Sequence, residues 1–464
     1  MNRTRSESTH SEASSRRSFL KQAGSLSGAA FLAPAIVPSS VLGTGAPSNK
    51  ITVGAIGVGR ISREHDLPGI IQHDQARVIA VCDVDSKRCA EGRQFVESLY
   101  AKKGIPASGV RQYADYRELL QSSEIDAVVI STPDHWHAKP AIEAAQAGKD
   151  VYLQKPASLT VAEGRAMSDA VHRTGRIFQL GTQQRSMEQF RVACELVRNG
   201  RIGRVHTVRV GLPTDPAGEE WSEMPVPKNL NYDFWLGSTP YVYYTENRVH
   251  PQKDYSRPGW LRCEQFGAGM ITGWGVHHLD IVHWGLGLEY TGPVELKGKG
   301  EFPTRGLWDV HGKYNIELMY AGGVTVHISD ELPNGVRFEG SEGWIFVTRG
   351  SYTATTSDPA AGRQNQRALM ASDPKILAST IGPDEVHLYR SRDQHGNWLE
   401  CIRTRQQPIS PVEVGHRSTT VCLLSHIAMK LARPLRWDPV RERFRDDDEA
   451  NQRLARPQRP PYQI

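Results

Sequence analysis

The sequence has few cysteines, and none are spaced to act in pairs. Six cysteines are spread over 464 residues without a CxxC motif, at positions 82, 89, 194, 263, 401 and 422. This spacing argues against a disulfide framework and against a structural zinc site.

A strong excess of one charge is missing as well. The net charge of +5 is small for 464 residues, and the basic residues do not cluster on one expected helix or strand. A nucleic-acid-binding surface needs such a cluster, so we do not expect nucleic acid as a partner. Hydrophobic residues make up 39% and charged residues 23% of the chain, which is typical of a globular protein with a packed core.

Long hydrophobic runs are also absent. The most apolar N-terminal segment, residues 24–42, is broken by serines and prolines, whereas a membrane-spanning helix needs about 20 predominantly apolar residues. The segment before it, Ser15-Arg16-Arg17-Ser18-Phe19-Leu20-Lys21, is typical of a twin-arginine export signal. We interpret residues 1–46 as this signal and a linker, with a candidate cleavage site at Ala33-Pro34-Ala35. The prediction is a periplasmic protein, exported folded by the twin-arginine machinery, that does not span a membrane when mature.

The next part of the chain alternates strand and helix patterns. Short β-branched runs occur at 51–56, 78–82, 127–130 and 151–153, and helical patterns at 86–103, 116–121, 138–147 and 161–173. Such alternation predicts an α/β fold of parallel βαβ units. We place a dinucleotide-binding Rossmann domain at 47–173.

The pattern changes after residue 200. Strand patterns occur at 205–212, 313–320, 324–328, 336–339 and 344–348, and helical patterns at 275–286 and 411–432. They predict a second α/β domain, 174–464, with an open and mainly antiparallel sheet. Residues 213–258 form a long loop without periodicity, which we expect to wall or cover a site. We also expect the final segment to pack back on the Rossmann domain, and the open sheet to support a homo-oligomer.

A glycine-rich turn follows the first predicted strand. In Gly57-Val58-Gly59-Arg60-Ile61-Ser62, the first glycine permits a tight turn and the second lets the backbone approach a pyrophosphate. Ser62 is small enough for close helix packing at the third position. Asp83 ends the second predicted strand, where a carboxylate bonds a ribose 2′-hydroxyl. With Asp85 nearby it favours NAD over NADP, although Lys87 and Arg88 favour the phosphorylated cofactor.

Two further motifs follow predicted strands, where ligands bind in open α/β sheets. They are Ser131-Thr132-Pro133-Asp134-His135-Trp136-His137 and Gln154-Lys155-Pro156. Together with the glycine turn and Gly275-Val276-His277, they make the chain resemble the glucose-fructose oxidoreductase / inositol dehydrogenase family. The resemblance covers essentially the whole chain after the signal.

This resemblance implies an enzyme that oxidises or reduces sugars, inositols or related polyols with a bound nicotinamide cofactor. It implies that Lys155 orients the reacting oxygen and that His277 exchanges its proton. The residues that it implies contact or shape the cofactor site are Gly57, Gly59, Arg60, Ile61, Ser62, Asp83, Thr132, Pro133, His137, Gln154 and Lys155.

The sequence departs from the family pattern at two positions. Gln154 stands where a glutamate is usual before the lysine, and Gly273 where an aspartate is frequent four residues before the histidine. Asp280 lies three residues after His277 on the same helical face, so we predict that it orients that histidine.

Arg185, Trp274 and His278 are the predicted substrate-side residues, and aromatic residues are dense in the second half, as suits a sugar ring. His277, His278, Asp280 and His283 do not have zincin spacing, so we expect no metal site.

Together these features predict an exported NAD-dependent oxidoreductase that acts on a sugar or glycoside hydroxyl, with C3 as one candidate carbon. The enzyme would keep its cofactor bound and recycle it in place. One alternative is an NAD-dependent glycoside hydrolase that works by transient oxidation and elimination. Another is a non-catalytic carbohydrate-binding protein of the same fold.

Overall fold

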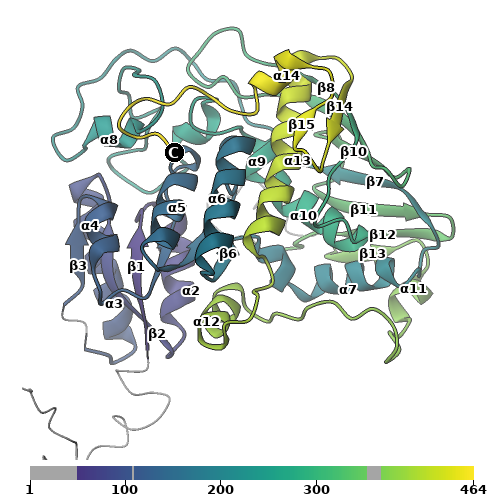
Figure 1. Ribbon diagram of the computed structural model, residues 1–464, viewed down its shortest axis with the longest axis horizontal. Coiled ribbons are helices and arrows are strands. Elements are labelled where there is room, and N and C mark those ends of the chain that lie inside the picture. Colours follow the sequence, from purple (N-terminus) through teal and green to yellow (C-terminus); the bar gives the residue numbers. More distant parts are fainter. Residues whose placement is uncertain (1–49, 107–108, 353–366) are drawn as a thin grey trace, which may run out of the picture. The chain divides into compact units, whose positions relative to one another are not determined.

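The computed structural model describes residues 50–106, 109–352 and 367–464 (Figure 1). The twin-arginine motif lies outside these residues. Residues Lys50–Ile464 form one compact unit. Across the described part of the chain, no helix has both the length and the apolar character needed to span a membrane.

The first sheet is parallel throughout, with strand order β3-β2-β1-β4-β5-β6. Its strands are β1 Ile51–Ile56, β2 Ala76–Cys82, β3 Arg111–Tyr113, β4 Ala127–Ile130, β5 Asp150–Leu153 and β6 Phe178–Leu180. The order reverses between β1 and β4, and ligands bind at such a reversal, beyond the carboxyl ends of the strands. The predicted Rossmann fold is confirmed, and β6 extends the sheet past residue 173.

Helices cover both faces of this sheet. They are α2 Leu67–Ile71, α3 Ser86–Lys102, α4 Tyr116–Gln121, α5 Ala138–Gln146, α6 Val161–Thr174 and α12 Gln394–Thr404. Helix α6 shows why the sequence folds locally as it does. Thr160 and Glu163 form a reciprocal capping box at its start, and Gly175 ends it with a left-handed φ of 63°.

In the described residues the second sheet has nine strands, in the order β13-β12-β11-β7-β10-β9-β8-β14-β15. Its strands are β7 Val205–Gly211, β8 Glu295–Gly300, β9 Tyr314–Met319, β10 Thr325–Ser329, β11 Gly335–Gly340, β12 Gly343–Val347, β13 Leu369–Ala371, β14 Leu435–Asp438 and β15 Arg443–Phe444. The β7–β10 pair is parallel and the other pairs are antiparallel. The predicted second domain, with its mainly antiparallel sheet, is therefore confirmed.

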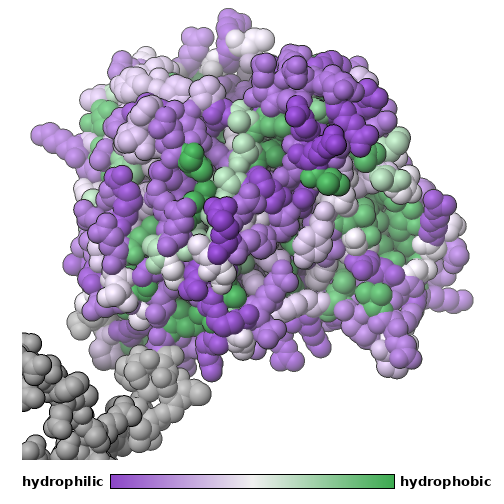
Figure 2. Space-filling view, in the orientation of Figure 1, coloured by the Kyte–Doolittle hydropathy of each residue, from purple (hydrophilic) through white to green (hydrophobic). Residues whose placement is uncertain are grey.

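One face of the second sheet is buried under helices. Figure 1 shows α7 Glu188–Arg198, α10 Gly275–Leu286 and α13 Val412–Leu431 beside it. The other face carries charged side chains in ion pairs, such as Arg209–Glu339 and Lys297–Glu317. Figure 2 shows one side of the molecule, which is covered mainly by hydrophilic residues with hydrophobic residues between them. The homo-oligomer stays a prediction.

Two irregular segments join the halves of the molecule. The long loop contains only α8 Tyr232–Leu236 and packs against the carboxyl edge of the parallel sheet. The final segment runs back over the Rossmann helices, where Ala162 N donates to Leu454 O and Tyr462 stacks on Phe234 at a centroid distance of 5.7 Å. The remaining helices are α9 Met270–Gly273, α11 Pro374–Ala378 and α14 Asp448–Gln452.

Candidate functional site

The turn after β1 is shaped to admit a phosphate group. Gly57 has a φ of +82°, and a Cβ atom there would lie 2.9 Å from the carbonyl group of Ser131. Only glycine fits this position. At Gly59, a Cβ atom would meet nothing within 4 Å among the described residues, so the backbone borders open space. The helix that begins at Arg60 directs its amides there, and such a cradle fits the pyrophosphate of a dinucleotide.

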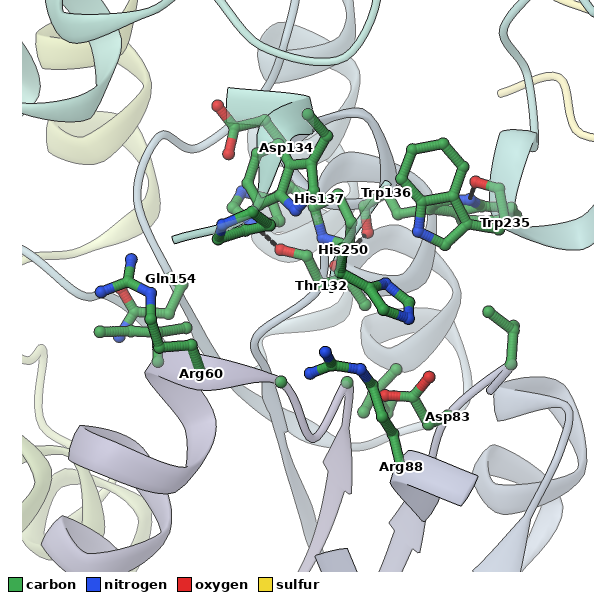
Figure 3. A pocket seen from close by; sticks show the side chains of 18 of the residues that line it. Arg60, Asp83, Arg88, Thr132, Asp134, Trp136, His137, Gln154, Trp235 and His250 are labelled. Carbon is green, nitrogen blue, oxygen red and sulfur yellow. Dashed lines mark hydrogen bonds between the residues drawn. The ribbon is translucent and has the colours of Figure 1, made fainter. Parts of the chain in front are cut away.

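A pocket runs from this turn along the carboxyl edge of the parallel sheet. Figure 3 shows Arg60 and Gln154 towards one end and Asp83 and Arg88 towards the other. The pocket is lined by nearly all of the predicted cofactor residues: Gly57, Gly59, Arg60, Ile61, Asp83, Thr132, Pro133, His137, Gln154 and Lys155. Ser62 is fully buried behind the turn, as close packing requires. The structure brings these residues together, and their individual roles stay predictions.

His137 ties two walls of the pocket together. Its ring nitrogens lie 2.9 Å from the Thr132 carbonyl oxygen and 2.5 Å from the Pro156 carbonyl oxygen. Burial lowers the pKa of His137, and the two carbonyl oxygens oppose that shift. The histidine therefore holds the Thr132 and Pro156 segments together beside the pocket.

At the Asp83 end, the long loop is fastened to the Rossmann half. Asp85 begins α3 as its N-cap and also lies 3.0 Å from His250 Nε2 and 2.7 Å from Asn229 Nδ2. Arg88 donates to the carbonyl oxygens of Pro251 at 2.6 Å and Asp254 at 3.0 Å. We call residues 229–254 the strap, since this segment is bonded to the start of α3 and lines the pocket through Phe234, Trp235 and His250.

Asp83 lies under the strap, at the end of β2. Its carboxylate accepts hydrogen bonds from Val58 N at 3.0 Å and Asp85 N at 2.9 Å. Burial raises the pKa of Asp83, although both amides oppose that rise. Lys87 Nζ donates to the carbonyl oxygen of Gln252 at 2.6 Å, so its charge, like that of Arg88, is already engaged by the strap.

At the other end, Lys155 and Asp134 share a partly enclosed space. Lys155 Nζ donates to the carbonyl oxygen of Gly273 at 2.7 Å. Burial lowers the pKa of Lys155; Asp134 opposes this shift, while the charges of Arg349, Arg257 and Arg60 add to it. Burial raises the pKa of Asp134, and Lys155 limits that rise. Both groups therefore titrate closer to neutral pH than an isolated lysine or aspartate does.

His277 lies near this pair on α10, and it is almost fully buried. Burial, and then the charges of Arg349 and Lys155, lower its pKa well below the ordinary value, so the imidazole is neutral. Its Nδ1 atom is buried and has no hydrogen-bond partner among the described residues. The centroids of the Trp274 and His277 rings lie 6.3 Å apart. The guanidinium carbon of Arg349 lies 4.5 Å from the centroid of the Trp274 ring.

Gln154 belongs to a buried polar network that explains its departure from glutamate. Its Nε2 atom donates to Asp66 Oδ1 at 2.7 Å, and Ser131 Oγ donates to Asp66 Oδ2 at 2.7 Å. Burial alone would raise the pKa of Asp66, but hydrogen bonds with His395 and His65 hold it well below its usual range. A glutamate at 154 would place a second carboxylate against this ionised one.

His65, Asp66 and His395 also form the one group in the described residues whose spacing could hold a metal, with ligand atoms within 4.8 Å of one another. None of these three residues was predicted from the sequence. The Asp66 carboxylate accepts hydrogen bonds from Gln154 and Ser131, and both histidines lie against its Oδ1 atom.

Three predicted site residues have other partners. Asp280 pairs with Arg185 at 2.6 and 2.9 Å and accepts from Ser418 Oγ at 2.8 Å, rather than bonding His277. This places Arg185 in a buried ion pair. His278 is fully buried, with Nε2 2.8 Å from Asn334 Oδ1, and the substrate roles of Arg185 and His278 stay predictions. The position of Trp274 beside His277 leaves its substrate role a prediction.

Residues 51–182 match an oxidoreductase family described by its NAD-binding Rossmann fold, and residues 216–357 and 383–464 match the C-terminal α/β domain of the same family. The chain belongs to the Gfo/Idh/MocA oxidoreductase family.

Similar members of this family differ in chemistry. A glycosyl hydrolase family 109 protein of Shewanella pealeana is 32% identical over 41% of this chain and 44% of its own length. Myo-inositol 2-dehydrogenase of Thermotoga maritima is 31% identical over 36% of this chain and 46% of its own length. The chain thus matches just under half the length of each of these Gfo/Idh/MocA relatives.

The fold is shared with solved structures. An aldose-aldose oxidoreductase from Caulobacter crescentus, complexed with glycerol, superposes with a TM-score of 0.57 at 20% identity. The match covers 83% of this chain and 99% of that one. At this identity the likeness supports the Gfo/Idh/MocA architecture alone.

Sequence reasoning missed the acidic and basic groups that complete the site. Asp134 lies inside a motif that was recognised, but its burial beside Lys155 comes from folding. His250 and Arg257 lie in the long loop, where no periodicity indicates which side chains face inward. The only available signal was the length of that loop.

Proposed function

We propose that this protein is an NAD-dependent oxidoreductase that acts on a CH–OH group of a sugar. The observation that carries the proposal is the partly buried Lys155 ammonium at the end of a dinucleotide-shaped pocket, with neutral His277 nearby. When bound, the nicotinamide would accept a hydride from the carbon that bears the hydroxyl.

The chain's own groups would handle the charge and the proton. Lys155 uses one N–H on the Gly273 carbonyl, which leaves others for the reacting oxygen. An ammonium at that position stabilises the negative charge that develops there. Neutral His277 would accept the hydroxyl proton, which positioned bases do with gains of about 10²–10⁴-fold.

NAD is favoured over NADP by the Asp83 end of the pocket. A 2′-phosphate there would face the Asp83 carboxylate. Arg88 and Lys87, the cations that could offset this repulsion, already bind carbonyl oxygens of the strap. Moving them would leave those oxygens without their donors, which costs about 1–3 kcal/mol for each group.

Export of the folded protein to the periplasm is part of the proposal. Its support is the twin-arginine motif in the sequence and the strap, which would retain a cofactor where free NAD is scarce. A retained cofactor must return to its starting redox state in place. Either one sugar is oxidised and a second sugar is then reduced, or the reaction on a single substrate has no net redox change.

A redox-neutral glycoside hydrolysis is the second candidate, and Asp134 favours it. Oxidation at C3 would make the C2 hydrogen acidic, a base would remove it, and the aglycone would leave from C1. Water would then add to the resulting double bond, and reduction at C3 would restore the sugar. The raised pKa of Asp134 suits a group that protonates the leaving oxygen.

The test is to denature purified protein and to identify the released nucleotide and its redox state, before and after exposure to a panel of sugars and nitrophenyl glycosides. The oxidoreductase predicts released NAD that becomes reduced with a substrate. The hydrolase predicts nitrophenol release with no net change in redox state. Absence of nucleotide together with absence of turnover would overturn both, and would support a carbohydrate-binding protein.

A further inference from the structure

A groove adjoins the reacting end of the pocket and carries two arginines. Its lining includes Asp215, Arg257, Arg262 and Met270, and it meets the main pocket at Ser256. Both guanidinium groups lie 3.3 Å from the same oxygen, Asp215 Oδ1. Two cations therefore share one carboxylate, and one positive charge is left over.

Arg257 is held loosely compared with the arginine of another buried ion pair, whereas Arg262 also stacks on Trp308 at 4.3 Å. Arg185 binds Asp280 through two bonds of 2.6 and 2.9 Å, the lengths expected of charge-assisted bonds. Among the described residues, Arg257 makes the 3.3 Å contact and a 3.9 Å approach to Met270 Sδ, and its buried Nε has no hydrogen-bond partner. A buried donor left in this way requires an explanation, and an anionic ligand supplies one. The buried Asp215 Oδ2 also lacks a partner within the described chain, but an anion has no proton to give it.

Gly273 and Met270 lie between Lys155 and this groove. The carbonyl of Gly273 accepts the Lys155 hydrogen bond, and a Cβ atom at Gly273 would meet only Met270 Sδ, at 3.8 Å, within the described chain. The same sulfur atom approaches Arg257. Met270 thus marks a short path from the reacting group to the spare guanidinium.

The charges around Lys155 act on its pKa in both directions. Arg257, Arg349 and Arg60 lower that pKa, and Asp134 raises it. In the groove itself, Arg257 and Arg262 face the single carboxylate of Asp215. Excess positive charge in a partly buried space is costly, so an anion that enters the groove is favoured.

We propose that this groove binds a carboxylate carried by the substrate, so that the sugar is a uronic or aldonic acid. This inference rests on the proposed function and names its substrate class. The carboxylate lies against Arg257 while the reacting hydroxyl reaches Lys155. A single negative charge balances the single excess cation of the groove, whereas a phosphate dianion exceeds it.

Direct binding tests the proposal without requiring turnover. The cofactor-loaded protein is titrated by calorimetry with methyl glucuronide, methyl glucoside and glucose 6-phosphate. We expect the glucuronide to bind at least tenfold more tightly than the glucoside, and more tightly than the phosphate. Equal affinity for glucuronide and glucoside overturns the proposal, and tighter phosphate binding overturns the carboxylate assignment.

Variants locate the effect. Arg257→Gln should remove the tenfold preference while changing glucoside affinity by less than about twofold. Arg198→Gln, at a half-buried arginine elsewhere, should keep the preference.

Gly273→Asp provides a second test that does not depend on substituting Arg257. A Cβ atom there meets only Met270 Sδ, at 3.8 Å, within the described residues, and the added carboxylate should weaken glucuronide binding about tenfold. Gly273→Ala, which adds bulk without charge, should keep the preference.

The outcomes separate this inference from the proposed function. An Arg257-dependent preference in a protein that oxidises no sugar supports the subsite and contradicts the oxidoreductase. Turnover of neutral sugars with no preference for the acid supports the oxidoreductase and overturns the subsite.

Discussion

The two ends of the pocket differ in how completely their polar groups are satisfied. At the strap end, Asp85 has partners from both halves of the molecule, and Arg88 bonds two carbonyl oxygens. At the reacting end, His277 Nδ1 and Arg257 Nε are buried without a hydrogen-bond partner in the described residues. The strap has one such group as well, the hydroxyl of Tyr244. Under the proposed function, the bonds of Asp85 and Arg88 would retain the cofactor at the strap end, and the unmade bonds of His277 and Arg257 would be available to a substrate at the reacting end.

The largest effect should come from breaking the reacting end. Lys155→Ala removes the ammonium that faces the reacting oxygen, and we expect turnover to fall by about 10²–10⁴-fold. Initial rates with the substrate found in the panel measure it. Lys139→Ala, whose ammonium instead binds the carbonyl of Gln463, is the control and should keep its rate. A loss of less than tenfold in Lys155→Ala would contradict the assignment.

The next effect tests whether Asp280 belongs to the scaffold. Asp280→Ala leaves the Arg185 charge buried without its main partner, so we expect the free energy of unfolding to fall by about 3–5 kcal/mol. Chemical denaturation measures it. Arg209→Ala, from the exposed pair with Glu339, should cost no more than about 1 kcal/mol. If Asp280→Ala is as stable as the parent protein but turns over slowly, Asp280 has the orienting role after all.

Weakening the strap should change retention without changing chemistry. Arg88→Gln removes a charged donor from the carbonyl oxygens of Pro251 and Asp254, and we expect NADH to dissociate about tenfold faster. Fluorescence after rapid dilution into excess NAD gives this rate. Arg93→Gln, on the exposed side of the same helix, is the matched control. An unchanged dissociation rate in Arg88→Gln would show that the strap does not retain the cofactor.

The smallest effect is a shift in pH dependence. Lys155 must be protonated to stabilise the oxygen, so activity should fall as pH rises through its lowered pKa. The negative charge of Asp134 raises the pKa of Lys155. Asp134→Asn removes that charge, and the falling limb of the kcat/KM profile should move to lower pH by about one unit. A falling limb that stays in place, or moves to higher pH, would show that the charge of Asp134 does not raise the pKa of Lys155.

Regular elements and the cofactor turn could be predicted because their signals are local. The strand at 51–56 and the helix at 275–286 have the predicted bounds, since both are periodic and clearly limited. Strands β3 and β6 span three residues each and carry too little pattern to detect. Asp280 shows the opposite error: spacing on the helix favoured His277, but Arg185, 95 residues away, makes the stronger bond.

The reacting end could be predicted only in part for the same reason. Lys155 and His277 stand in recognisable motifs. Arg257, Asp215 and Asp134 become a group only when the long loop folds against α9 and the parallel sheet. No spacing in the sequence reports that contact.

The strap has a consequence for the timing of cofactor exchange. Its bonds join residues 85–88 to residues 229–254. Under the proposed function, a dinucleotide beneath the strap would leave only after that region opens. Exchange would then proceed at the rate of local unfolding and would not speed up as free nucleotide becomes more concentrated. The fraction of molecules that carry a cofactor would be decided while the chain folds.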